Sequence, residues 1–321
     1  MNCYAGIDFG GMSVKVGLFD DRANLLTKLS AATSKEDGYA ATVEKTVQTV
    51  RGACAKAGVP AAQLAAVGMG TPGVIDGENG IVVRWTNYGW EDKPFAADLE
   101  KRLGVPVRVT NDANAAALGE AKFGAGKKYK SSILLTLGTG IGSGIVLDGK
   151  LFEGTCGGGA EAGHMVIESG GVPCPCGRRG CFEQYASATA LIRDTKRAMF
   201  ENKNSALWRI AGTPENVDGR TAFLAAREGD AAARKVVDTF VQYLADGIAN
   251  LIALFRPEAI LLGGGICAEG EPLLAPLREK VDAMLFGGSS YAPVRILAAS
   301  LGNDAGLCGA ARLAMMRCAA L

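Results

Sequence analysis

The sequence contains one local pattern twice, and this duplication limits the folds available to the chain more than any other feature. The first copy, IDFGGMSVKVGLFD, covers residues 7–20, and the second, LTLGTGIGSGIVLD, covers residues 135–148. Each reads as an apolar strand, a glycine-rich turn and a returning strand that ends at an aspartate, with Gly10 matching Gly138. The repeat predicts two related domains that face one another.

Glycine turns of this kind let backbone N–H groups approach an anion, because no Cβ stands in the way. A single glycine cluster is more often an ordinary tight hairpin, but two matched copies favour a nucleotide triphosphate gripped from two sides. Neither copy fits the G-x-x-x-x-G-K-[ST] loop or a full dinucleotide fingerprint. We therefore expect a different phosphate-binding arrangement.

The rest of the chain alternates predicted strands and helices, which indicates an α/β architecture with mostly covered sheets. Hydrophobic periodicity predicts strands at 64–70, 105–110 and 259–265, and helices at 39–57, 94–103, from Asp112 onward, near 185–199, 219–228 and 231–255.

Composition excludes several classes of partner. Lys and Arg total 34 against 33 Asp and Glu, so a nucleic acid or a membrane surface is not expected to bind. No apolar run reaches the ~18 residues of a membrane helix, and the N-terminal residues do not read as a signal peptide. The nine cysteines are an odd number and most stand singly, as in a cytoplasmic protein with reduced thiols.

One short segment combines the single histidine of the chain with three cysteines. The spacing is His164-x9-Cys174-x-Cys176-x4-Cys181, with Pro173 among the residues that stiffen it. Three thiolates and one imidazole make a closed tetrahedral zinc set of the structural type. The alternative is a cluster of buried, satisfied thiols, which such density in a cytosolic chain disfavours.

Asp112 is the candidate catalytic base. It lies where a predicted strand gives way to a helix, at the rim of a sheet where open α/β folds bind ligands. Asn and Asp are also favoured as helix caps, so either Asn111 or Asp112 could cap the helix while the other faces a ligand. The sequence alone leaves both assignments open.

Seven motifs in order carry a resemblance to a known family: DFGGMSVK, GTPG (70–73), NDANAA (111–116), LGTGIGSG (137–144), EAGHM (161–165), CPCGRRGCFEQYAS (174–187) and LGGGI (262–266). This combination resembles the ROK family, whose members include bacterial glucokinases, other sugar kinases and sugar-responsive repressors. The resemblance implies the two-lobed, actin-like (ribonuclease H-like) α/β fold with a duplicated core and a zinc-binding loop, and with ATP and sugar in the cleft.

The resemblance and the repeat together suggest how the chain is divided. We expect an N-terminal lobe at residues 1–120, with a helix at about 303–321 packing back on it, and a C-terminal lobe at 121–302 with the zinc knuckle. A homodimer or homotetramer is expected.

By the resemblance, Asp112 accepts the proton of the sugar hydroxyl, and five further residues bind the sugar: Asn87, Asn111, Glu161, His164 and Glu183. His164 can do two jobs, with one ring nitrogen on zinc and the other toward the sugar. A plain surface position is the ordinary expectation for a glutamate, but Glu161 and Glu183 flank the metal motif.

ATP and Mg²⁺ are the expected cofactors beside structural Zn²⁺. Asp8 would place the magnesium, through water. Phosphate contacts are expected from Gly10, Gly11, Ser13, Lys15, Gly138, Thr139 and Gly140, and room for adenosine from Gly263, Gly264 and Gly265. A plain strand-to-helix turn is the alternative for this last triplet. The family usually has Thr after its glycine pair, whereas Met12 stands here, so a hydroxyl contact falls to Ser13 or is replaced by backbone amides.

The expected activity is therefore ATP-dependent phosphorylation of a hexose, with glucose to glucose 6-phosphate as the first candidate. Alternatives are kinases for N-acetylmannosamine, allose or fructose, and a non-catalytic sugar sensor of the repressor type. A repressor would carry a DNA-binding segment before the first glycine turn, which the sequence is not expected to hold, since its first strand begins by Tyr4.

Overall fold

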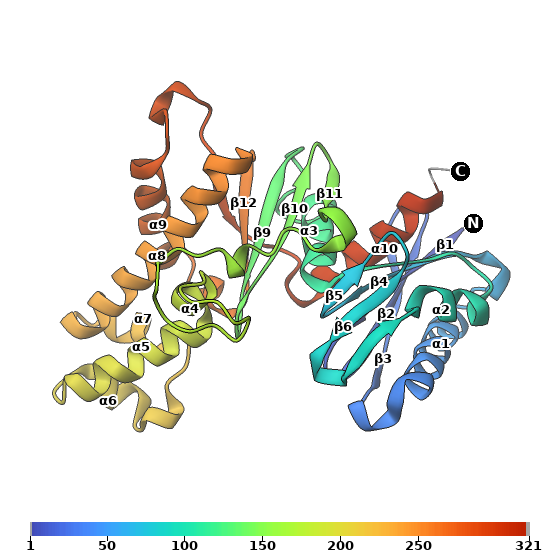
Figure 1. Cartoon of the computed structure of the whole chain (residues 1–321), viewed down its shortest axis with the longest axis horizontal. Coiled ribbons are helices and arrows are strands. Elements are labelled where there is room, and N and C mark those ends of the chain that lie inside the picture. Colours follow the sequence, from blue (N-terminus) through green and yellow to red (C-terminus); the bar gives the residue numbers. More distant parts are fainter. Residues whose placement is uncertain (1, 319–321) are drawn as a thin grey trace. The chain divides into compact units, whose positions relative to one another are not determined.

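The computed structural model describes residues 2–318, which form two compact units (Figure 1). Unit 1 comprises the residues up to Leu134, the segment Gly144–Ala160 and the chain from Ser300 onward. Unit 2 comprises Leu135–Ser143 and Glu161–Ala299. The division into lobes at 1–120 and 121–302 stays a prediction, and residues 319–321 of the expected last helix lie outside the described residues.

Unit 1 is built on a five-stranded sheet in the order β3-β2-β1-β4-β8. Strand β1 pairs antiparallel with β2 and parallel with β4, and β8 continues the sheet parallel to β4. The strands are β1 (Cys3–Phe9), β2 (Ser13–Asp20), β3 (Leu25–Ala32), β4 (Leu64–Thr71) and β8 (Val107–Asn111). The predicted hairpin around Gly10 is therefore confirmed.

Helices cover both faces of this sheet: α1 (Gly38–Lys56), α2 (Phe95–Leu103), α3 (Asp112–Phe123) and α10 (Ala305–Cys318). Alternate residues of β1 face opposite sides, so Ile7 packs in the cluster with Val47 of α1, whereas Tyr4 packs with Ala314 of α10. Figure 1 shows α10 beside β1 and β4.

Small residues let α10 lie directly on the sheet. A Cβ added at Gly6 would overlap the carbonyl oxygen of Leu307, and one at Gly68 would overlap that of Ala310. The helix backbone therefore rests on the strand backbone, and any larger residue at either glycine would push the helix away.

The end of α3 is tied to the segment that leads into α10. The Glu120 side chain is fully buried and its carboxylate accepts hydrogen bonds from three backbone amides, those of Ala125 (2.9 Å), Ser300 (2.8 Å) and Leu301 (2.6 Å). A buried carboxylate requires such partners, because its transfer from water is otherwise costly.

A second, small sheet in unit 1 holds the loop that contains Asn87. It consists of β5 (Val74–Asp76), β6 (Ile81–Trp85) and β7 (Trp90–Lys93), all antiparallel, with the 3-10 helix η3 (Thr86–Tyr88) between β6 and β7. The rings of Trp85, Tyr88 and Trp90 join Phe9 in the core. The sequence analysis did not predict this sheet.

The other five-stranded sheet has the order β11-β10-β9-β12-β13, which repeats the order of the first. Its strands are β9 (Ser132–Leu137), β10 (Ile141–Leu147), β11 (Lys150–Phe152), β12 (Ala259–Gly263) and β13 (Arg295–Ala298). Strands β10 and β11 pair antiparallel and β12 and β13 pair parallel, as do their counterparts β2 with β3 and β4 with β8. The predicted duplication is confirmed.

The helices of unit 2 are α4 (Glu183–Ala186), α5 (Ala188–Glu201), α6 (Ala206–Ala211), α7 (Thr221–Arg227), α8 (Ala231–Phe255) and α9 (Glu271–Met284). The predicted helix at 231–255 is confirmed. The one predicted near 185–199 is divided, because Ser187 is extended and caps α5 by accepting a hydrogen bond from the Ala190 amide.

None of the helices among residues 2–318 is both long enough and apolar enough to span a lipid bilayer.

Candidate active site and metal centre

Strand β8 runs directly into α3, with Asn111 and Asp112 at the junction. The sequence left open which of these two residues caps the helix. Asn111 is the N-cap: its side-chain oxygen accepts a hydrogen bond from the Ala113 amide at 2.8 Å, and its Nδ2 donates to the Gly73 carbonyl at 3.2 Å. Asp112 is the first residue of the helix. The capping alternative is thus settled for Asn111, whose contact with a sugar stays a prediction.

Asp112 lies in an environment that favours its protonated form. Burial raises the pKa of its carboxyl group, and the negative charge of Asp8 adds to this effect. The hydrogen bond from the Ala113 amide to Oδ1, 2.8 Å long, opposes the shift without cancelling it. Asp8 lies near the end of β1 and Asp112 follows the end of β8, with β4 between these two strands, and two acidic groups so placed make this rim suited to proton transfer and to cation binding.

Asp8 is the penultimate residue of β1, and its Oδ2 lies 3.3 Å from Nζ of Lys15. Lys15 stands opposite Asp8 on β2. The structure therefore brings these two predicted phosphate-site residues together with Asp112. One carboxylate with space for solvent matches the way Mg²⁺ is usually held, by few protein ligands and several waters.

The glycine turn of unit 1 connects β1 with β2. The Gly10 amide donates to the Ser13 carbonyl at 2.9 Å, which closes the turn, and the Met12 side chain is 83% exposed. Gly11 and Ser13 belong to the same turn, so the predicted phosphate residues of this copy are contiguous in space. Asn87 is exposed on η3, next to Tyr88, whose hydroxyl contacts this turn.

In unit 2 the predicted metal ligands converge. The ligand atoms of His164, Cys174, Cys176 and Cys181 all lie within 4.8 Å of one another. Sγ of Cys174 is 3.7 Å from Nδ1 of His164, and the Sγ atoms of Cys176 and Cys181 are 3.6 Å apart. Zn–S bonds of ~2.3 Å in a tetrahedron place sulfurs about 3.8 Å apart, so the group fits a metal ion of this kind.

Metal binding requires the thiolate form of the three cysteines. Burial raises the pKa of Cys174 to about 12, and burial raises that of Cys181 also, whereas a backbone hydrogen bond from Arg178 lowers that of Cys176. A cation that binds thiolates would displace these protons and offset the cost of burying the sulfurs. The donor set and its closure support a structural metal centre.

Glu183 lies beside this centre. Its Oε1 is 3.1 Å from Sγ of Cys174 and 3.7 Å from Nδ1 of His164. Its other oxygen fills the space next to Gly140, where an added Cβ would overlap Oε2. The carboxylate thus stands between the metal centre and the second glycine turn.

The second glycine turn connects β9 with β10, and the Gly138 amide donates to the Gly140 carbonyl at 3.0 Å. Gly264, which has a φ of +103°, packs against it from the end of β12: an added Cβ would overlap the Leu137 carbonyl oxygen. The structure therefore places Gly263–Gly265 beside Gly138–Gly140, and the exposed Thr139 lies between the two glycines. These are the predicted nucleotide positions of unit 2.

The 3-10 helix η5 (Ala162–His164) orients the residues that precede the knuckle. The Ala162 amide donates to Oγ of Ser143 at 2.9 Å, which fixes η5 to β10, and a Cβ at Gly163 would overlap the Ile141 carbonyl oxygen. Glu161 is exposed at the start of η5. His164 and Glu183 therefore lie at the candidate metal centre and Glu161 directly precedes η5, while sugar binding by these three residues stays a prediction.

Two contributors were missed by the sequence analysis. Ser143, in β10, anchors η5, and Tyr88 contacts the first glycine turn. Ser143 could have been identified in the sequence because it places a hydroxyl group within an otherwise apolar predicted strand. Tyr88 stood within the aromatic WTNYGW segment, which drew attention only to Asn87.

Comparison with known proteins agrees with these features. The model of the ROK family matches residues 4–317. This chain belongs to the ROK family. The glucokinase of Thermotoga maritima is 40% identical to it over 96% of each chain. The structure of a ROK family glucokinase from Streptomyces griseus, in complex with glucose and AMPPNP, is 37% identical and superimposes with a TM-score of 0.78 over 98% of this chain and 100% of its own. The predicted actin-like fold class is confirmed.

Another relative is named as a repressor and not as a kinase. The xylose repressor of Caldicellulosiruptor bescii is 32% identical over 87% of this chain, which corresponds to 65% of the repressor. The family fold therefore serves both named kinases and named regulators, and fold alone does not decide between them.

Proposed function

We propose that this ROK family protein is an ATP-dependent hexose kinase whose preferred acceptor is glucose, with glucose 6-phosphate and ADP as products. The observation that carries the proposal is Asp112, a carboxyl group of raised pKa that begins α3 beside Asp8. The similarity to a glucokinase at 40% identity over 96% of each chain supports the same activity.

Asp112 acts as the general base in this proposal. A sugar hydroxyl must lose its proton as it bonds to phosphorus, and a base is most effective when its pKa lies near the working pH. The Ala113 amide holds Oδ1, and we assign proton acceptance to Oδ2. Burial supplies the raised pKa that makes the carboxylate a better base than an exposed aspartate.

Asp8 would hold the magnesium ion that accompanies ATP, through water, and that ion would neutralise charge on the phosphates. Lys15, paired with Asp8 at 3.3 Å, supplies a positive charge at the same rim. The two glycine turns supply backbone amides for the phosphates, and Gly263–Gly265 leave space for adenosine.

Sugar recognition is assigned to Glu161, His164 and Glu183, with Asn87 and Asn111. His164 directs Nδ1 toward the cysteines, which leaves Nε2 for a sugar hydroxyl. The metal, which we propose to be zinc, has four protein ligands and so no position for a reacting water. Its effect is to hold His164 and the neighbouring Glu183 in one arrangement.

The test is a coupled ADP-release assay with Mg²⁺-ATP and a panel of hexoses. A pocket built around particular hydroxyls leaves polar groups unpaired when a hydroxyl moves, at about 1–3 kcal/mol each. Glucose should therefore exceed its C2, C3 and C4 epimers in kcat/KM. Higher values for N-acetylmannosamine, allose or fructose would replace glucose as the acceptor and keep the hexose kinase.

A non-catalytic sugar sensor is the second candidate, because a repressor is 32% identical over 87% of this chain. Such a sensor would bind a hexose without releasing ADP. Sugar binding by calorimetry together with the absence of phosphorylation of every hexose in the panel would favour the sensor over the kinase.

A further inference from the structure

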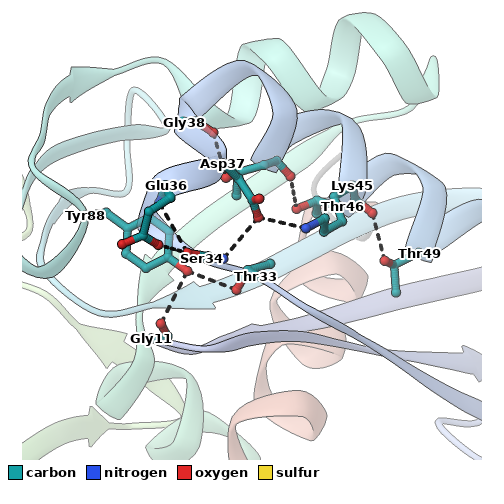
Figure 2. A network of polar contacts seen from close by, with 11 residues as sticks. Gly11, Thr33, Ser34, Glu36, Asp37, Gly38, Lys45, Thr46, Thr49 and Tyr88 are labelled. Carbon is teal, nitrogen blue, oxygen red and sulfur yellow. Dashed lines mark hydrogen bonds and ion pairs between the residues drawn. The ribbon is translucent and has the colours of Figure 1, made fainter.

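The hydroxyl group of Tyr88 joins the loop of Asn87 to the first glycine turn (Figure 2). It donates a hydrogen bond to the carbonyl oxygen of Gly11 at 3.3 Å and lies 2.9 Å from Oγ1 of Thr33. Tyr88 is within donor distance of both oxygens but has one hydroxyl proton, and a carbonyl can only accept, so Tyr88 donates to Gly11 when the Thr33 hydroxyl donates to Tyr88. The two hydroxyls thus form a chain that ends on the turn.

The tyrosine ring cannot easily leave this position. Tyr88 is 8% exposed, and its ring stacks on that of Trp85 at 4.2 Å between centroids. The rings of Trp90, at 4.9 Å, and Phe9, at 6.0 Å, meet it edge to face. Because Phe9 directly precedes Gly10, the same core that holds the ring also holds the start of the turn.

The hydrogen bond to Gly11 has a consequence for the next amide. A trans peptide is planar, with C=O and N–H on opposite sides, so a Gly11 carbonyl directed at Tyr88 turns the Met12 N–H away from it. The Met12 carbonyl in turn accepts a hydrogen bond from the Thr33 amide at 3.0 Å. The Gly11–Met12 peptide and the Met12–Ser13 peptide are therefore both oriented by neighbours in unit 1.

We propose that Tyr88 is a positioning residue for the nucleotide phosphates: its hydroxyl fixes the peptide between Gly11 and Met12 so that the Met12 N–H is presented to phosphate. This rests on the proposed function of the turn. It also explains how the turn works with methionine at a position where no hydroxyl side chain is available, since the backbone amide then provides the contact.

Tyr88→Phe removes the hydroxyl and keeps the stacked ring. We expect the KM for ATP and the dissociation constant of a non-hydrolysable ATP analogue to rise about threefold to tenfold, with the KM for glucose within about twofold of the unaltered protein. Tyr39→Phe is the matched control: Tyr39 belongs to the same aromatic cluster, and its hydroxyl donates to Asp98 at 2.7 Å, away from the turn.

Both variants lose one hydrogen bond, so both should show a similar small fall in Tm, whereas only Tyr88→Phe should weaken nucleotide binding. Thr33→Val, which removes the other hydroxyl of the chain, should act in the same direction, and the double variant should be no worse than the stronger single one. Equal nucleotide binding by Tyr88→Phe and Tyr39→Phe would overturn the positioning role. Failure of the unaltered protein to phosphorylate any hexose would instead overturn the proposed function, and the analogue-binding comparison would still decide on Tyr88.

Discussion

The two glycine turns have the same place in their sheets but are supported in different ways. The turn at Gly10 is backed by the aromatic core and by the hydroxyls of Tyr88 and Thr33. The turn at Gly138 is backed by Gly264 and by Glu183, which borders the metal centre. The first turn is thus supported by apolar packing and side-chain hydroxyls, and the second by backbone contacts and by a carboxylate beside the candidate metal ligands.

The acidic groups are also unequally distributed. Asp8 stands two residues before Gly10, whereas Thr136 stands two residues before Gly138. Strand β8 is followed by Asp112, whereas the equivalent strand β13 is followed by Ala299. The duplicated framework therefore carries Asp8 and Asp112, to which we assign magnesium binding and proton acceptance, in one copy alone.

The largest expected effect concerns Asp112. Asp112→Asn keeps the size of the side chain but removes the base, so kcat should fall by ~10²–10⁴ while glucose binding persists. Turnover and calorimetric glucose binding measured on the same preparation test this. Near-normal turnover of the variant would show that Asp112 does not accept the proton of the sugar hydroxyl.

The same substitution should not destabilise the protein. Because the pKa of Asp112 is raised on folding, the folded state binds the proton more tightly than the unfolded state. Stability from this group is therefore lost as pH rises from about 4, the ordinary Asp value, through the raised pKa. At neutral pH the ionised carboxylate opposes folding and the asparagine does not, so the Tm of the variant should equal or exceed that of the unaltered protein.

The next effect concerns the candidate metal centre beside the second glycine turn. Cys176→Ser should abolish metal binding and weaken glucose binding about 10- to 100-fold, because the loop that holds His164 and Glu183 loses its order. Elemental analysis should give one zinc per chain before the change and none after it. Cys156→Ser, an exposed cysteine outside the cluster, is the control and should keep the metal. Active protein free of zinc and other transition metals would refute the metal-ordered loop.

A smaller effect is expected at the backbone contact behind the second turn. Gly264→Ala introduces a Cβ that overlaps the Leu137 carbonyl at a φ of +103°, so it should cost about 1–3 kcal/mol of stability and raise the KM for ATP about tenfold. Gly265→Ala is a close control, since nothing lies within 4 Å of its added Cβ. Equal stability of the two variants in urea unfolding would contradict this account.

The smallest effect compares the hydroxyls of the two turns. Thr139 is exposed at the tip of its turn, and Thr139→Ala should raise the KM for ATP about twofold to tenfold. Ser13→Ala should change it less than about threefold, because the first turn offers the Met12 amide in place of a side chain. A larger loss from Ser13→Ala than from Thr139→Ala would assign the hydroxyl contact to the first turn.

The sequence predicted those features whose signals are local. The two glycine turns, the helix at 231–255 and the spacing of His164 with its three cysteines each lie within one short stretch, and all three appear in the structure. The break at Ser187 was missed because apolar residues continue on both sides of it. The Ser187 hydroxyl accepts a hydrogen bond from the Ala190 amide, and this cap starts a new helix despite the continuous hydrophobic pattern.

Contacts between distant segments could not be predicted in this way. Gly264 reads as an ordinary loop glycine until the Leu137 carbonyl is found against it, 127 positions earlier in the chain. The Tyr88 hydroxyl likewise meets Gly11 across 77 positions. Such pairings depend on how the sheets and loops assemble, which hydrophobic periodicity does not specify.

The position of α10 on the sheet of unit 1 bears on the order in which the chain matures during translation. Strands β1 and β4 leave the ribosome early, but the helix that covers Gly6 and Gly68 follows only after the whole of Glu161–Ala299 has been synthesised. The part of this face over Gly6 and Gly68 therefore stays uncovered while unit 2 can already fold. A nascent chain halted before residue 305 should accordingly need a chaperone over that face, and full-length release should end the need.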